Sequence, residues 1–179
     1  MRLDHIAYRV KNREETTSFL KKAFGYEISD EFEIDFGDCK KALCYALIPP
    51  EKKNKKKNMS FISFISTEDA DFHLPCEIFV SEGTKDSIVY NWVKERGGIG
   101  GIHHVAYQVA SVKDVMDKWK KEDLAEFTTE EPIESSDLTQ CFTKPHPLTG
   151  IIYEFIERKN KGFNVDNVKK LMISTEDIK

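Results

Sequence analysis

The sequence predicts an α+β fold in which two tandem βαβββ modules form one domain. An internal repeat is the main observation: residues 3–10 (LDHIAYRV) resemble residues 102–109 (IHHVAYQV), so that His5 aligns with His104. A helical pattern follows each copy, and similar short strands, CEIFV and YEFIE, lie near the ends of the two halves. A strand, a helix and further strands used twice in the same order indicate a duplicated unit.

The first half begins with the strand at residues 3–10. Asn12 is a typical helix N-cap and Glu15 completes a capping box, so we expect a helix from there to Phe24, where Gly25 ends it. Alternating apolar residues then predict three strands, at residues 26–34, 40–47 and 76–80.

An insertion separates the last two of these strands. Residues 48–58 hold two prolines and five lysines. Because proline interrupts strand pairing and the lysines repel one another, we expect an exposed loop. The alternating residues 58–67 that follow it predict a short additional strand.

The second half repeats the plan of the first. An amphipathic helix at residues 86–96 and a glycine hinge at 97–101 connect the halves, and Ser111 caps a helix at 111–122. Strands are predicted at residues 102–109, near 126–133, at 138–143 and at 150–157, and a last helix at 164–174. The predicted organisation is a first module at 1–84 with a lysine-rich loop at 49–58, a linking helix and hinge at 85–101, a second module at 102–158 and a C-terminal tail or helix at 159–179.

Composition narrows the class of function. Lys and Arg number 27 against 31 Asp and Glu, a net charge of −4, so the chain lacks the basic footprint of a nucleic-acid-binding protein. No apolar run approaches the roughly 18 residues of a membrane span, and the polar start MRLDHIAYRV does not resemble a signal peptide. We therefore expect a cytoplasmic protein with reduced cysteines and a small-molecule substrate, without nucleic-acid or membrane partners. Pairing of two copies through strand edges, as a homodimer, is compatible with the sequence.

Polar residues at equivalent positions of the repeat predict a shared metal site. If an approximate two-fold axis relates the halves, His5 and His104 meet, with Glu77 and Glu154 beside them. Two imidazoles and two carboxylates suit a single divalent ion such as Co²⁺, Zn²⁺, Ni²⁺, Mn²⁺ or Fe²⁺. A strand histidine is often structural and a glutamate often solvated, but burying four such groups unpaired is costly, which favours a metal.

Other polar residues have less distinctive positions. Side chains alternate across a strand, so Arg9 shares a face with His5, and Gln108 with His104; either can bind a substrate carboxylate or pair with an acid at the rim. On the same alternation His103 points away from His104 and is expected to be structural. The two remaining histidines, His73 and His146, are expected in solvated loops.

The doubled pattern, with the motifs DHIAYRV, GGIHHVAYQV and GIIYEFIER, resembles the vicinal-oxygen-chelate (glyoxalase/bleomycin resistance/dioxygenase) superfamily. This resemblance implies a curved sheet around a metal site. Within the superfamily the spacing is similar to that of the methylmalonyl-CoA epimerases, whose typical ending appears here as Phe142, Pro145, Gly150 and Glu154.

The epimerase resemblance implies a chemistry and a ligand set. His5, Glu77, His104 and Glu154 would be metal ligands, although epimerases often have Gln at the position of Glu77. The metal would polarise a carbonyl and stabilise the enolate formed when an α-proton leaves, on an acyl-CoA or related carbonyl substrate. Glu77 and Glu154 are the candidate acid–base groups, with Asp35 or Asp38 as alternatives.

Three other functions stay open. Residues 138–145 and 162–171 are similar to the end of 4-hydroxyphenylpyruvate dioxygenase, which implies an iron site of His5, His104 and Glu154 with Gln140 touching substrate. That enzyme is about twice as long, and Glu77 would be a surplus carboxylate in it. A glyoxalase I-like lyase uses Glu at the position of Glu77, but its glutathione-binding pattern is not visible here. The third is a metal-free, non-catalytic binding protein of the same fold.

Overall fold

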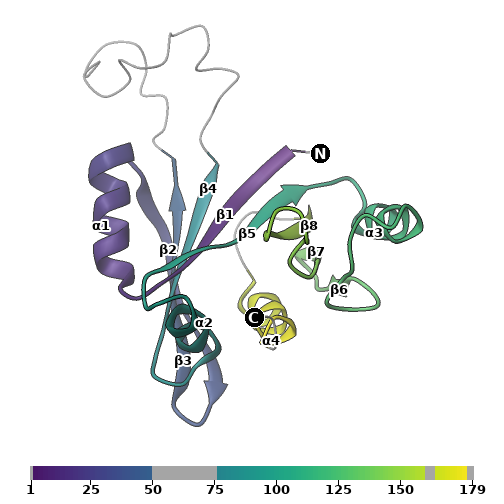
Figure 1. The fold of residues 1–179 in the computed structure, drawn as a ribbon. Coiled ribbons are helices and arrows are strands. Elements are labelled where there is room, and N and C mark those ends of the chain that lie inside the picture. Colours follow the sequence, from purple (N-terminus) through teal and green to yellow (C-terminus); the bar gives the residue numbers. More distant parts are fainter. Residues whose placement is uncertain (1, 50–75, 160–163, 177–179) are drawn as a thin grey trace, which may run out of the picture.

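A computed structural model describes residues 2–49, 76–159 and 164–176 of the 179-residue chain. The described residues form one eight-stranded sheet with four helices (Figure 1). The strands are β1 (Arg2–Val10), β2 (Glu27–Gly37), β3 (Lys40–Ile48), β4 (Glu77–Gly83), β5 (Gly100–Gln108), β6 (Ile133–Glu134), β7 (Leu138–Phe142) and β8 (Ile152–Arg158). The helices are α1 (Arg13–Phe24), α2 (Ile88–Glu95), α3 (Val112–Lys121) and α4 (Val165–Ser174). The lysine-rich loop beyond residue 49, the strand predicted at 58–67 and His73 lie outside the described residues.

The sheet confirms the predicted α+β fold with its duplicated plan. Its strand order is β2-β3-β4-β1-β5-β8-β7-β6, with β1 and β5 antiparallel at the centre. Each central strand has a parallel neighbour from its own half, β4 beside β1 and β8 beside β5. The repeated strands 3–10 and 102–109 thus meet along the middle of one curled sheet.

Local sequence signals set the helix ends. The Asn12 side chain accepts a hydrogen bond from the Glu15 N–H, and Gly25 ends α1 with a left-handed φ of 74°. Ser111 caps α3 in the same way through the Asp114 N–H. The two helices cover the outer face of the sheet, α1 through a cluster that includes Leu20 and α3 through one that includes Met116.

One predicted strand is wrong. Residues 126–133 form only an isolated antiparallel bridge, between Phe127 and Thr143, and the strand β6 is reduced to Ile133–Glu134. Pro132 has no N–H to donate to a ladder, and it follows two consecutive glutamates.

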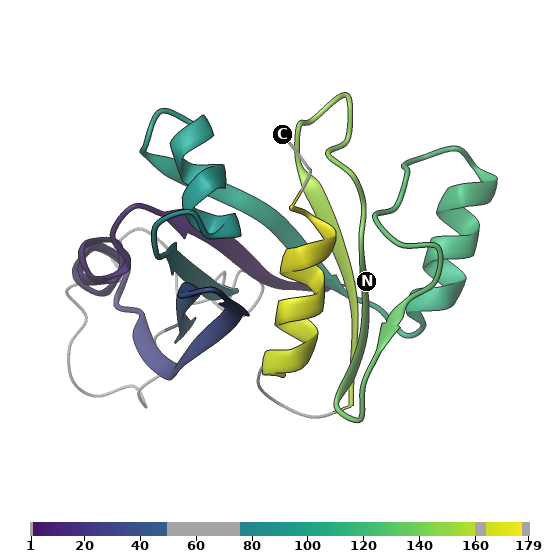
Figure 2. The same cartoon turned by 90° about the horizontal axis from the view of Figure 1, so that it is seen from below.

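The C-terminal helix α4 lies inside the fold, between the two halves of the curved sheet (Figure 2). Its Asn164 N-cap accepts from the Asn167 N–H, and its buried residues Leu171 and Met172 belong to clusters on the inner face of the sheet. The predicted last helix therefore covers the concave face, where His5 and His104 lie. Every helix among the described residues is too short or too polar to span a bilayer.

Candidate metal centre

Three buried side chains from three neighbouring strands converge on the concave face. His5 on β1 and Glu154 on β8 are both paired with Ala106 of β5, so one row of the sheet holds both residues with a small side chain between them. His104 lies two residues before Ala106 and on the same side. The order β1-β5-β8 therefore brings the repeat histidines and one glutamate together, and all three are buried.

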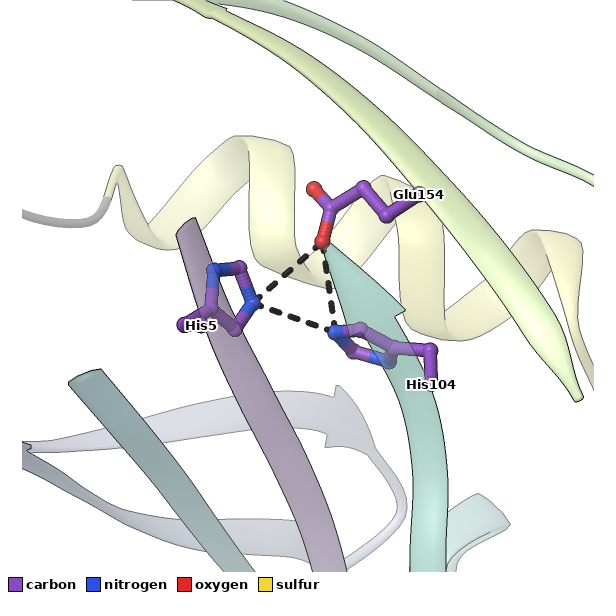
Figure 3. Close-up of side chains that lie close together, drawn as sticks. All are labelled: His5, His104 and Glu154. Carbon is purple, nitrogen blue, oxygen red and sulfur yellow. Dashed lines mark hydrogen bonds and ion pairs between the residues drawn. The ribbon is translucent and has the colours of Figure 1, made fainter. Parts of the chain in front are cut away.

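The ligand atoms of these residues face one another (Figure 3). His5 Nε2 lies 3.2 Å from His104 Nε2 and 3.3 Å from Glu154 Oε2, and His104 Nε2 lies 3.2 Å from the same oxygen. For bonds of about 2.1 Å to a metal, ligand atoms stand about 3.0 Å apart at right angles and about 3.4 Å apart in a tetrahedron. The triangle therefore fits a divalent ion with three protein ligands and open positions. Among the described residues it is the one such group of His, Cys, Asp or Glu.

Asp4 binds the ring nitrogen of His5 that faces away from His104 and Glu154. The Asp4 carboxylate accepts from His5 Nδ1 at 2.8 Å and from Arg158 Nε and Nη2 at 2.9 and 2.7 Å. A proton on Nδ1 leaves His5 Nε2 to face the centre, which is the usual arrangement of a metal-ligating histidine. The sequence interpretation missed Asp4; its signal was an acidic residue directly before a candidate ligand.

The charges of the centre are strongly coupled. Burial opposes charge on both His5 and Glu154. The hydrogen bonds with Asp4 and Glu154 nevertheless raise the pKa of His5 to about 9. Those from His104 and His5 lower the pKa of Glu154 to about 2. Burial lowers the pKa of His104. Without metal, His5 and Glu154 thus form a buried ion pair, which a divalent ion would replace.

Glu77 does not join this group. Its Cα pairs with His5 in the β1–β4 ladder, but its side chain is 45% exposed and lies 4.0 Å from Arg158 Nη2. The structure thus brings together three of the four predicted ligands. The alternative acids Asp35 and Asp38 are exposed in the β2–β3 hairpin, away from the concave face.

His103 lies on the same side as His104, contrary to expectation. The β1–β5 register shifts at this point, since Ala7 pairs with His104 but Tyr8 pairs with Ile102. The extra residue on β5 is a β-bulge, which cancels the usual alternation of side chains. His103 is buried, and its Nδ1 lies 2.8 Å from His104 Nδ1.

A cavity of about 40 Å³ adjoins the three ligands. Arg9, His103 and Gln140 line it together with Phe79, Phe142 and residues of α4. Buried Arg9 donates from Nη2 to Thr175 Oγ1 at 3.1 Å, while Nη1 has no hydrogen-bond partner among the described residues. Gln140 Nε2 likewise has none there.

The other predicted polar residues lie elsewhere. Gln108 is half-buried at the end of β5 and is not part of the cavity lining. His146, in the β7–β8 loop, accepts at Nδ1 from the Leu148 N–H at 3.3 Å.

Comparisons with known proteins agree with this fold. The family model described as the Glyoxalase/Bleomycin resistance protein/Dioxygenase superfamily matches residues 2–143. No match is found among curated proteins. A triple mutant of 4-hydroxymandelate synthase from Streptomyces coelicolor is similar in structure, with a TM-score of 0.70 and 17% identity over 97% of this chain. This chain covers 54% of that protein, about half its length.

Methylmalonyl-CoA epimerases are also similar in structure. One matches with a TM-score of 0.61 and 17% identity, over 89% of this chain and 97% of its own. That from Mycobacterium tuberculosis matches with a TM-score of 0.60 and 14% identity, over 89% of each chain. Likeness at such identities shows a common fold.

Proposed function

Because this chain belongs to the Glyoxalase/Bleomycin resistance protein/Dioxygenase superfamily, we propose that it is a divalent-metal-dependent enzyme whose metal is held by His5, His104 and Glu154. The observation that carries the proposal is the buried triangle of His5 Nε2, His104 Nε2 and Glu154 Oε2. The hydrogen bond from His5 Nδ1 to Asp4 supports it, because this bond sets the tautomer that a metal-bound imidazole needs. The donor set accepts Co²⁺, Zn²⁺, Ni²⁺, Mn²⁺ or Fe²⁺.

The proposed reaction is epimerisation or isomerisation next to the carbonyl of an acyl-CoA or related substrate. A divalent ion would act as a Lewis acid that acidifies the α-proton. The epimerase structures support this reaction, because most of their length, 97% and 89%, matches 89% of this chain. Glu77 is our candidate for proton transfer: its Cα is paired with His5, and its half-exposed carboxylate can approach a ligand at the rim.

Metal content and proton exchange test this function together. We expect purified protein to bind near-stoichiometric metal and to exchange the α-proton of methylmalonyl-CoA in D₂O. His104→Ala should lose both properties, and Glu77→Gln should lose exchange but keep the metal. His146→Ala, which removes a histidine outside the centre, should change neither. Absence of metal binding would contradict the proposal and favour a non-catalytic binding protein.

A non-haem iron dioxygenase is the second candidate. The group of two histidines and one carboxylate, with Glu77 apart, is the ligand set typical of such enzymes. Gln140 lines the cavity, which supports the substrate contact that the dioxygenase resemblance implies for it. Iron in the purified protein, with oxygen consumption on adding a 2-oxo acid and no α-proton exchange, would favour this reading over the epimerase.

A further inference from the structure

A second, larger cavity lies at the end of the sheet where α2 packs against β1 and β4 (Figure 1). Its volume is about 500 Å³, against about 40 Å³ for the cavity beside the metal centre. Sites for small molecules commonly measure about 300–1,000 Å³. The second cavity therefore has room for a whole ligand as the chain stands.

This cavity is separate from the one at the metal centre. Arg9 and Ser81 line the cavity beside the metal, whereas the next residue of each strand, Val10 and Glu82, lines the second cavity. The two strands are in regular register here, with Arg9 paired with Ser81 and Val10 with Glu82. Because side chains alternate across a strand, the two cavities lie on opposite sides of β1 and β4.

One part of the second cavity is basic. Lys11, Lys85 and Lys94 line it, and in the part of the chain that the structure describes none of the three has an ion-pair partner. The acidic lining residue Glu82 accepts a hydrogen bond at Oε2 from the Arg13 N–H at 2.8 Å. In a chain of net charge −4, three ammonium groups around one cavity form a local positive field that attracts a multiply charged anion.

Another part of the wall suits a flat ring. Tyr90 and Lys94 are four residues apart on α2, so they share one face of the helix, with Val93 beside them. Tyr90 is half-buried, and within the described ranges its hydroxyl has no hydrogen-bond partner. Gly97 and Gly98 line the same cavity with nothing within 4 Å of their Cβ positions, so no side chain fills the space there. An aromatic ring beside open backbone accommodates a stacked ring of a ligand.

We propose that this cavity binds a free nucleotide, with its phosphates among Lys11, Lys85 and Lys94 and its base against Tyr90. A nucleoside diphosphate combines a multiply charged anion with a flat aromatic ring, which are the two chemistries that the wall presents. Because the cavity lies across the strands from the metal centre, the nucleotide is a second ligand and not part of a substrate held by the metal. The inference is independent of the proposed metal chemistry.

Calorimetry with ADP, pyrophosphate and adenosine tests this site, with a chelator present so that no phosphate binds a metal ion. We expect ADP to bind, and pyrophosphate and adenosine each to bind at least about tenfold more weakly, because each lacks part of the contacts. Lys11→Gln, Lys85→Gln and Lys94→Gln together should weaken ADP binding at least about tenfold, the effect of one charge-assisted hydrogen bond. Tyr90→Leu should weaken the binding of ADP but not that of pyrophosphate.

The matched control replaces Lys21, Lys22 and Lys118 by Gln. These lysines are exposed on α1 and α3, outside the cavity, and their loss changes the net charge by the same amount. The control should bind ADP like the wild type. No binding of ADP to the wild type, or equal ADP affinity in the two triple variants, would overturn the proposal.

Two further results would overturn the free nucleotide in particular. Pyrophosphate that binds as tightly as ADP would show that the cavity holds an anion without a base. ADP that competes with methylmalonyl-CoA in the proton-exchange assay would show that the cavity holds the nucleotide part of the substrate. We expect ADP to leave the apparent KM of this exchange unchanged.

Discussion

The imidazole of His5 is fixed at both nitrogens, by Asp4 at Nδ1 and by Glu154 and His104 at Nε2. Asp4→Asn keeps the size of the side chain but allows its amide to donate to Nδ1, which permits the wrong tautomer. We expect Zn²⁺ affinity to fall about tenfold or more, as for other hydrogen-bond partners of metal-ligating histidines. Competition with a chromophoric chelator measures this change.

Asp117→Asn is the matched control for Asp4→Asn. Asp117 lies on the exposed face of α3, where its carboxylate pairs with Lys113 at 3.3 Å. Exposed pairs of this kind contribute little, so the control should bind Zn²⁺ like the wild type. Equal affinities in both variants would show that Asp4 has no role in the centre.

The buried histidines predict an optimum of stability for the metal-free protein near the ordinary histidine pKa of about 6.5. Burial lowers the pKa of His103 and of His104, so below this pH the unfolded chain binds protons that the folded chain does not, and stability rises with pH. The pKa of His5 is raised to about 9 by Asp4 and Glu154 in spite of burial. Between the ordinary pKa of about 6.5 and the raised pKa of about 9, only the folded chain keeps the His5 proton. The stability of the folded protein therefore falls as pH rises through 9.

Urea unfolding with a chelator present, from pH 5 to 9, measures this profile. Saturating Zn²⁺ should remove the alkaline decline, since a metal binds the deprotonated imidazole. His5→Gln should also remove it, because the group that keeps its proton is gone. Metal-free stability that rises from pH 6.5 to 9 would contradict the assignment of His5.

At the scale of elements, local signals sufficed for the helices but not for the details of the strands. Asn12, Gly25 and Ser111 set helix ends through bonds to nearby residues, so the sequence alone predicts them. The bulge at His103 depends on how β5 pairs with β1, which strict alternation along one strand cannot show. The place of Glu77 depends on Arg158, a residue from the other half of the chain.

The junction of β1 with β5 predicts a specific role for Gly100. Its φ is +87°, and a Cβ there would lie 2.1 Å from the Arg9 carbonyl oxygen. Gly100→Ala should therefore destabilise the fold by well over about 1 kcal/mol. Gly97 has a similar φ of +70° with nothing within 4 Å of its Cβ position, so Gly97→Ala carries only the backbone strain. Urea unfolding of the two variants isolates the clash, and equal losses of stability would argue against the close approach.

At the scale of the whole molecule, the centre joins the two halves of the duplicated chain. His5 comes from the first strand of the first half, and His104 and Glu154 come from the second half. The halves meet directly along β1 and β5, and α4 packs between them (Figure 2). A metal in this position connects both halves to one ion, so its binding energy adds to the stability of the whole fold rather than of one module.

Zn²⁺ at 100 times its Kd should accordingly stabilise the protein by about 2.7 kcal/mol. For a domain of this size the gain corresponds to a rise in Tm of roughly 5–10 °C. Differential scanning calorimetry should show one transition that moves up as a whole, because the ligands come from both halves. His104→Ala should remove most of the shift, since the remaining two ligands hold the ion weakly. A full rise in Tm in that variant would show that Zn²⁺ binds elsewhere. A second transition whose Tm does not change with Zn²⁺ would show that the halves unfold independently.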